Sequence, residues 1–147
     1  MISHMLDTNI CIDIIRGEHP HLLTRLNRYD PQNVGISSIV FAELHTGVCK
    51  SSKPAHNLEK LTDFCTPLVI VPFDSLAAES YGFVRTALEA AGTPIEPLDT
   101  LIAAHALACQ SILVTNNEKE FACVPGLQIE NWLTAPQSFA EATSWHR

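Results

Sequence analysis

Short apolar runs alternate with amphipathic stretches along most of this chain. The runs at 2–6, 34–36, 68–73 and 111–115 are short and apolar, and three of them are rich in β-branched residues, so they predict strands, with a weaker strand at 127–130. The β-branched run at 68–73 is typical of a central strand. Between the strands, apolar residues recur at helical spacing. This spacing predicts helices from Thr8 or Asn9 to Arg16, after Pro20, from Ser37 or Ser38 past Val48, at 56–65, from Asp74 or Ser75 to Ala91, at 98–109 and, as a short turn, at 119–122.

Alternation of strands and helices predicts an α/β fold with three layers, α/β/α, around a mostly parallel central sheet. Right-handed crossovers bring the carboxyl ends of such strands to one edge of the sheet. Asp7, Ser37 and Asn116 each follow a predicted strand, so we expect them to cluster there. The pattern indicates one domain over residues 1–133 and a polar tail over 134–147.

Composition and charge narrow the class of protein. The 147 residues are 46% hydrophobic and carry a formal net charge of −7, which indicates a globular chain. No apolar run approaches the roughly 20 residues of a membrane span, and the chain begins directly in a predicted strand. We therefore expect a cytoplasmic protein without a membrane segment. The negative charge argues against gripping long stretches of nucleic acid by counterion release alone, although it does not exclude a nuclease.

Cysteine usage gives no sign of a structural framework. The five cysteines are odd in number, and no pair has CxxC spacing, so neither a zinc site nor a disulfide framework is expected. Most fall in apolar, helix-like stretches and are predicted to be small buried hydrophobes. They are Cys11, Cys49, Cys65, Cys109 and Cys123.

Asp7 is the first candidate for chemistry, because an apolar strand ends directly on it. Open α/β sheets bind their ligands at the edge formed by the carboxyl ends of their strands, which is where Asp7 is expected. A helix N-cap is the competing interpretation, since a helix follows. Thr8 and Asn9 are also able to cap that helix, however, and we therefore favour metal ligation for Asp7.

Two further acids occupy structured positions without a basic neighbour in sequence. Glu43 interrupts an apolar helix near its start, where a capping or solvated role is the simpler interpretation. Asp99 follows two prolines and begins an alanine-rich helix, which predicts a rigidly held helix N-terminus. Capping is the alternative for Asp99, but the rigid approach favours function. Carboxylates on separate elements suggest a divalent-cation site.

The stretch after the last clear strand adds polar groups. Thr115, Asn116 and Asn117 form a predicted turn, and their side chains are suited to orienting water or contacting phosphate, although a plain polar turn competes. Glu120 is a further acid of the site or a group that supports it. His105, on an apolar helix, is predicted to be a satisfied core histidine. No GxSxG sequence, His triad or glycine-rich phosphate loop is present in the sequence.

Four segments in order, Met5–Ile10, Ile36–Leu44, Gly92–Ala106 and Val114–Phe121, together resemble PIN-domain proteins, specifically VapC-type toxins of bacterial toxin–antitoxin pairs. The resemblance extends to about Trp132. It implies that Asp7, Glu43 and Asp99 are the acidic metal-site residues, with Thr8 or Asn9 in support. Many PIN domains have a fourth acid where this chain has Asn117, and Glu120 is a plausible substitute.

The resemblance also implies Mg²⁺ or Mn²⁺ as cofactor, RNA and commonly tRNA as substrate, a homodimer and a cognate VapB-like antitoxin, with DNA contacted only through that antitoxin. The resulting hypothesis is a metal-dependent endoribonuclease, because a divalent metal activates water and polarises phosphoryl oxygens without a histidine base. One alternative is a non-cleaving PIN fold that acts only as a binding partner in an autoregulatory complex. Another is a phosphoryl-transfer enzyme of the haloacid-dehalogenase kind, disfavoured because Asn9 stands where that family needs a second acid.

Overall fold

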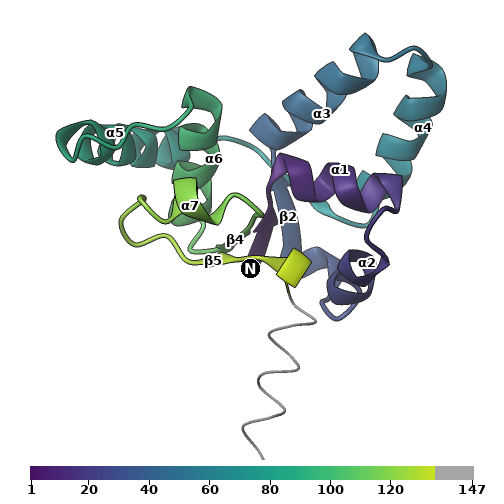
Figure 1. Cartoon of the computed structure of the whole chain (residues 1–147), viewed down its shortest axis with the longest axis horizontal. Helices are drawn as coiled ribbons and strands as arrows, with labels where there is room; N and C mark the ends of the chain where they lie inside the picture. The colour runs from purple at the N-terminus through teal and green to yellow at the C-terminus, as the bar shows by residue number, and fades with distance from the viewer. Residues whose placement is uncertain (135–147) are drawn as a thin grey trace, which may run out of the picture.

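Five short strands form one parallel sheet at the centre of this computed structural model, which describes residues 1–134 (Figure 1). They lie in the order β3-β2-β1-β4-β5, and every neighbouring pair is parallel. The predicted α/β class with a mostly parallel sheet is therefore confirmed. The strands are His4–Leu6 (β1), Val34–Ser37 (β2), Val69–Val71 (β3), Ile112–Val114 (β4) and Ile129–Glu130 (β5).

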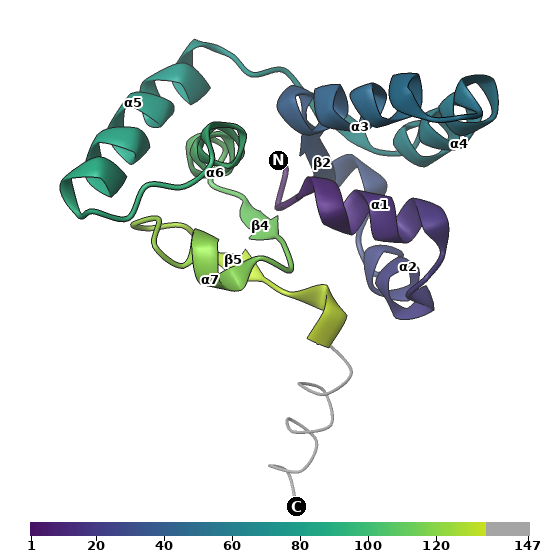
Figure 2. The ribbon, with the colours of Figure 1, turned by 45° about the horizontal axis from the view of Figure 1, so that its top comes forward.

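Helices cover both faces of the sheet. The helices α1 to α4 lie on one side and α5 to α7 on the other, which gives the three predicted layers (Figures 1 and 2). The bounds are Thr8–Arg16 (α1), Pro20–Leu26 (α2), Ser38–Lys50 (α3), Pro54–Cys65 (α4), Ser75–Ala90 (α5), Pro97–Ala108 (α6) and Glu118–Phe121 (α7), with 3₁₀ turns at Pro31–Asn33 (η1) and Trp132–Thr134 (η2). The turn η1 was not predicted.

Local sequence signals account for most helix ends. Asp7, Ser37 and Asp74 cap α1, α3 and α5 with side-chain oxygens that accept backbone N–H groups. Gly17 ends α1 in the left-handed conformation, with φ of 70°. The α4 helix begins at Pro54 and not at residue 56 as predicted, because proline at the first helical position already has a helical φ.

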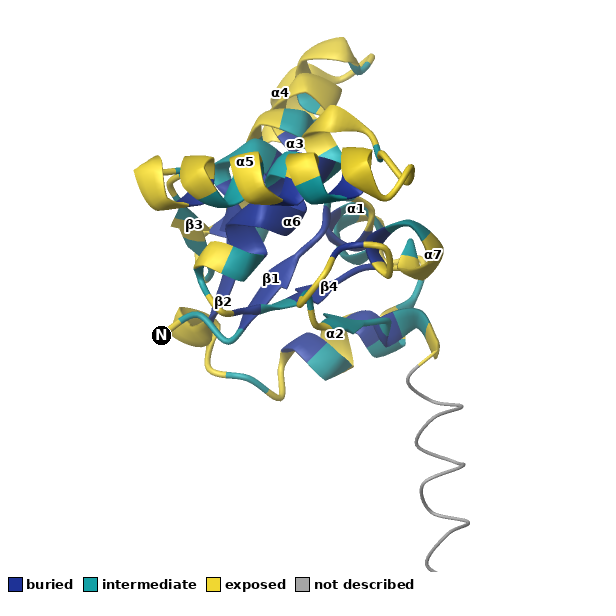
Figure 3. Cartoon of the chain, turned by 90° about the vertical axis from the view of Figure 1, so that its left-hand side faces the viewer, coloured by how far each residue is buried: buried dark blue, intermediate teal, exposed yellow. Residues whose placement is uncertain are grey.

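The central strands are buried, whereas β3 is an edge strand (Figure 3). The prediction of a central strand at 68–73 was therefore wrong. The β-branched residues of β3 form one outer edge of the sheet, and Ile70 is 40% exposed there. The strand packs very closely on β2, since a Cβ added to Gly35 would lie 2.9 Å from Val71 Cγ2.

The cysteines only partly match the expectation of buried hydrophobes. Cys11 and Cys65 are buried, whereas Cys49 and Cys123 are exposed and Cys109 is intermediate. Cys49 and Cys123 lie on the exposed side of their segments. The apolar composition of a segment does not show which of its side chains point to solvent. All five thiols are free, in agreement with the predicted lack of disulfides.

Residues 135–147 of the predicted polar tail lie outside the described part of the chain, which ends with η2. Trp132 in this turn is fully buried and contributes to the core. Within residues 1–134, no helix is both long and apolar enough to cross a membrane.

Strand order defines one special crevice. The chain builds β1, β2 and β3 outward in one direction, then returns to place β4 on the other side of β1. Connections from β1 and β4 therefore diverge to opposite faces, which opens a crevice at the carboxyl ends of these two strands. Asp7 follows β1 at this point, and Thr115 follows β4.

Candidate metal centre

Asp7 lies at the crevice and is only 5% exposed. Its backbone N–H donates to the Val114 carbonyl, 2.9 Å away, so the residue still continues the β1–β4 pairing. One carboxylate oxygen, Oδ1, accepts the Thr8 N–H at 2.8 Å, and Oδ2 accepts the Thr115 hydroxyl at 2.8 Å. The competing capping role of Asp7 is thus real. Each oxygen keeps unused acceptor capacity, so capping does not preclude metal ligation.

A hydrogen-bonded chain connects Asp7 to a second acid. The buried Thr115 Oγ1, which donates to Asp7, accepts the backbone N–H of Asn117 at 3.0 Å. The Asn117 side-chain amide donates to Glu120 Oε2 in a short hydrogen bond, and the Glu96 N–H reaches Glu120 Oε1 at 3.3 Å. Asn117 and Glu120 therefore differ in what they contribute: Glu120 brings a carboxylate, and the side-chain amide of Asn117 holds that carboxylate in position.

Glu43 reaches the same region from α3. Its Oε1 accepts the Thr8 hydroxyl at 2.8 Å, and the side chain is half-buried. Thr8 thus contacts both acids, since its backbone N–H binds Asp7 and its hydroxyl binds Glu43. Glu43 does not cap α3, since the side chain of Ser37 does so, and its partly buried carboxylate is held by Thr8.

Asp99, in the first turn of α6, completes the group. Burial raises the pKa of its carboxyl to about 7, and the charges of Asp7 and Glu120, a side-chain hydrogen bond with Glu120 and the charge of Glu43 add to this. Burial also raises the pKa of Asp7, in spite of the hydrogen bonds from Thr115 and Thr8 that lower it. The four acids therefore share one electrostatic environment in which added negative charge is costly.

Two residues expected near the site take no part in these contacts. Asn9 and Asn116 are exposed, and neither makes a side-chain hydrogen bond to the described residues 1–134. Asn9 lies in α1 one residue beyond Thr8, on its solvent side. The sequence could not tell whether Thr8 or Asn9 faces the crevice, nor whether Asn116 or Asn117 does.

Within the described part of the chain, no basic side chain forms an ion pair with the four acids. The ion pairs within residues 1–134 are His4–Glu130, Arg25–Glu130 and Arg85–Glu89, which lie elsewhere. The donor set at the crevice consists of carboxylate oxygens, which are the ligands that Mg²⁺ and Mn²⁺ prefer. A bound divalent cation would offset both the burial of these carboxylates and the mutual repulsion that together raise the two pKa values.

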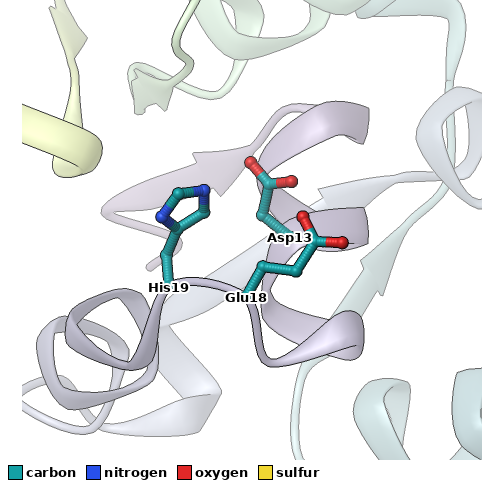
Figure 4. Close-up of side chains that lie close together, drawn as sticks. All are labelled: Asp13, Glu18 and His19. Carbon is teal, nitrogen blue, oxygen red and sulfur yellow. The ribbon is translucent and has the colours of Figure 1, made fainter.

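A tighter group of ligand atoms lies apart from these acids. Asp13 at the end of α1 and Glu18 and His19 in the connection to α2 place one ligand atom each within 4.8 Å of the others (Figure 4). It is the only such group of three among the described residues. The sequence analysis did not identify this group. The available signal was Asp13, which lies five residues before Glu18, with Gly17 ending the helix between them. The four acids at the crevice stand farther apart, which suits Mg²⁺ because this ion keeps several of its waters.

A groove adjoins the acids on the side of α1, α3 and α4. Its volume is about 240 Å³, and Glu43 is one of its lining residues. The remaining lining combines apolar side chains, such as Leu44 and Leu61, with polar ones that include Arg16 and Lys60. The candidate site is therefore continuous with a groove of mixed, partly apolar character.

Comparison with known proteins points in one direction. The family model described as the PIN domain matches residues 4–127. The Ribonuclease VapC2 of Rickettsia felis is 45% identical over 130 residues, which cover 88% of this chain and 97% of that protein. The tRNA(fMet)-specific endonuclease VapC of Salmonella typhimurium is 39% identical over 132 residues, which cover 90% of this chain and 99% of that protein.

A solved structure gives the same result in three dimensions. The VapBC2 complex from Rickettsia felis, bound to a DNA fragment from its promoter, contains a chain that superposes with a TM-score of 0.84 at 42% identity. The match covers 89% of this chain and 99% of that chain. The similarity therefore extends over nearly the whole described structure and over the full length of these relatives.

Proposed function

Because this chain belongs to the PIN-domain family, and within it to the VapC ribonucleases, we propose that it is the toxin of a type II toxin–antitoxin pair and cleaves RNA as an endoribonuclease. The observation that carries the proposal is the meeting of Asp7, Glu43, Asp99 and Glu120 at one sheet edge, with the pKa of Asp99 raised to about 7. These carboxylates have no basic partner among residues 1–134, and such a cluster at this edge of the sheet supports a bound cation.

PIN nucleases use a divalent metal, and we propose that here it is Mg²⁺ or Mn²⁺. Asp7 and Asp99 are the proposed direct ligands, and Glu43 acts as a ligand directly or through water. When bound, the metal supplies a lowered water pKa, polarised phosphoryl oxygens and compensation for developing negative charge. The all-oxygen donor set supports this choice of ion.

The chain's own residues hold these carboxylates in place. Thr115 fixes one oxygen of Asp7, and Thr8 fixes the other oxygen of Asp7 as well as Glu43. Fixed carboxylates need no rearrangement when substrate binds, which favours an in-line attack of water on the phosphodiester. Burial of Asp7 keeps bulk solvent from competing for it. No histidine base is required in this scheme.

We propose tRNA as the substrate, supported by 39% identity to a tRNA(fMet)-specific endonuclease over nearly the full length of that protein. The net charge of −7 fits recognition of a defined RNA shape better than a grip on long backbone stretches. A cytoplasmic location, where tRNA is available as a substrate, is part of this proposal. A homodimer, which the family implies, is part of the same proposal.

A VapB-like antitoxin neutralises the toxin and connects it to DNA. The VapBC2 complex of Rickettsia felis on promoter DNA supports this assignment. An Arg or Lys of the antitoxin that competes for the four acids would block metal binding, because such a pairing lowers the negative charge of the crevice. The groove next to Glu43 offers a partly apolar surface along which that segment can bind.

The direct test is cleavage of tRNA by the purified chain. We expect discrete cuts in a subset of tRNAs when Mg²⁺ or Mn²⁺ is present, and none when EDTA removes the metal, because the acids alone repel the phosphate. Cut positions are mapped by sequencing of the fragments. Intact RNA under all metal conditions, with Mn²⁺ binding undetectable by calorimetry, would instead support the alternative of a non-cleaving binding partner.

Glu120 and Asn117 are expected to differ in their effect on the metal. Glu120→Gln removes a carboxylate that contributes to the raised pKa of Asp99, so we expect Mn²⁺ to bind about tenfold more weakly. Asn117→Ala leaves that carboxylate and removes only its amide donor, so a loss of about threefold is expected. Calorimetric titration with Mn²⁺ measures both. A larger loss for Asn117→Ala would reverse the assignment and make Asn117 the residue that completes the site.

A further inference from the structure

His105 lies in the last turn of α6, the helix that begins with the Asp99 carboxylate. It is 1% exposed, and its Nδ1 lies 2.8 Å from Ser37 Oγ. Ser37, also 1% exposed, is the last residue of β2. The predicted satisfied core histidine is confirmed, but its partner belongs to another part of the candidate site.

Ser37 is the N-cap of α3, the helix that carries Glu43. Its Oγ accepts the backbone N–H of Ile39 at 3.0 Å. His105 also donates to the Pro72 carbonyl, and burial lowers the pKa of its imidazole. Because the Ser37 oxygen already accepts the Ile39 N–H, we assign its hydroxyl as the donor to Nδ1, with the ring proton on Nε2 toward Pro72.

The connection between β3 and α5 meets the same junction. The Phe73 ring lies edge-on to His105 with centroids 5.2 Å apart, and the Phe73 N–H donates to Ser38 Oγ at 3.0 Å. The α6 helix, the start of α3 and the β3–α5 connection are thus joined by neighbouring hydrogen bonds, of which the His105–Ser37 contact is buried. Among the described residues, the His105–Ser37 contact is the only side-chain hydrogen bond between α6 and the β2–α3 segment.

We infer that His105 is a positioning residue of the metal centre: through Ser37 it fixes the helix that carries Glu43 relative to the helix that carries Asp99. The inference rests on the proposed function of these acids. The physical reason is geometric, because Glu43 lies on α3 and Asp99 on α6, and within residues 1–134 no hydrogen bond joins their carboxylates. A small rotation of α3 against α6 would change the separation of the two carboxylates and weaken a cation bound between them.

Two substitutions separate the two hydrogen bonds of His105. Asn places an oxygen near the position of Nδ1 and keeps an acceptor for Ser37, whereas Gln places an amide near Nε2 and keeps only the donor to Pro72. We expect His105→Gln to weaken Mn²⁺ binding by about 3- to 10-fold, less than the roughly 10- to 100-fold typical of groups bound directly to a ligand. His105→Asn is expected to bind Mn²⁺ nearly as the wild type does.

Stability is measured alongside, with Leu22→Ala as the matched control. Leu22 is fully buried in α2, away from the acids, so this variant should unfold more easily while its Mn²⁺ affinity stays unchanged. Equal affinities for His105→Gln and the wild type, or equal losses for the Gln and Asn variants, would overturn the inference. A wild type that binds no Mn²⁺ would instead contradict the proposed function itself.

A double-mutant cycle gives a second, independent measurement. Ser37→Ala removes the hydroxyl that donates to His105 and is expected to weaken Mn²⁺ binding as well. Ser37→Ala also removes the cap of α3, but because His105 acts through Ser37, the double variant Ser37→Ala/His105→Gln should bind no more weakly than Ser37→Ala alone. Fold-losses that multiply would show that His105 and Ser37 act separately, which contradicts the inference.

Discussion

Asn in place of Asp7 is expected to lower the rate of tRNA cleavage by about 100-fold or more, because the site loses a charged ligand worth about 3 kcal/mol of transition-state stabilisation. The fold should survive. Asn caps helices as well as Asp does, so the hydrogen bond from the Thr8 N–H is retained. Removal of a buried charge whose pKa is raised also favours the folded state.

The measurement is a comparison of initial cleavage rates in excess Mg²⁺, with thermal unfolding recorded for each variant. Asp13→Asn is the matched control, since Asp13 lies on the same helix but belongs to the separate group with Glu18 and His19. It should cleave as the wild type does. A folded Asp7→Asn protein that cleaves at the wild-type rate, with contaminating nuclease excluded, would contradict the role proposed for Asp7.

The strand ends were predictable because the hydrophobic pattern agrees there with the residues that begin and end the following helix. An apolar run that stops at Asp7, before a helix that Gly17 ends, leaves little freedom in where the carboxylate lies. The place of β3 was not predictable in the same way. A run of β-branched residues reports burial on average, whereas strand order depends on crossovers between distant segments.

Side-chain direction within the site depended on tertiary contacts. Thr8 and Asn9 are neighbours with similar polarity, yet only Thr8 is directed toward Glu43, which comes from a helix 35 residues further along the chain. The His105–Ser37 contact spans 68 residues. Neither pairing has a local sequence signal, since an apolar helix with one histidine looks alike whether the ring meets water, a serine or a metal. The positions of the acids along the sequence therefore identified them, and only the fold identified what holds them.

Substitution of Asp99 by Asn is expected to stabilise the metal-free protein and at the same time abolish metal binding. The pKa of this carboxyl rises from 3.8 to about 7 on folding, with burial as the largest cause. Below about pH 4 the group is protonated in both states and has no effect on stability. Between about pH 4 and pH 7 the unfolded chain ionises this group while the folded state still holds the proton, so stability falls as the pH rises, and the loss is complete above about pH 7.

Because Asp99 is half-exposed, solvent screens much of this effect, and we expect a stabilisation of about 1 to 2 kcal/mol near pH 8 for Asp99→Asn in EDTA. This corresponds to a melting temperature about 3 to 6 °C higher than that of the wild type. Excess Mg²⁺ should raise the melting temperature of the wild type near pH 8 by binding only the folded state, and should leave Asp99→Asn unchanged.

Thermal unfolding near pH 5 and near pH 8, with EDTA or with Mg²⁺, tests both parts of this expectation. Asp63→Asn serves as the control, because Asp63 is an exposed acid on α4 and its replacement should leave the pH trend and the Mg²⁺ response as in the wild type. An Asp99→Asn protein that melts below the wild type in EDTA near pH 8 would show that the ionised Asp99 carboxyl of the wild type does not destabilise the folded state. The four acids would then be held by stabilising contacts, and a cation would not be needed to relieve their repulsion.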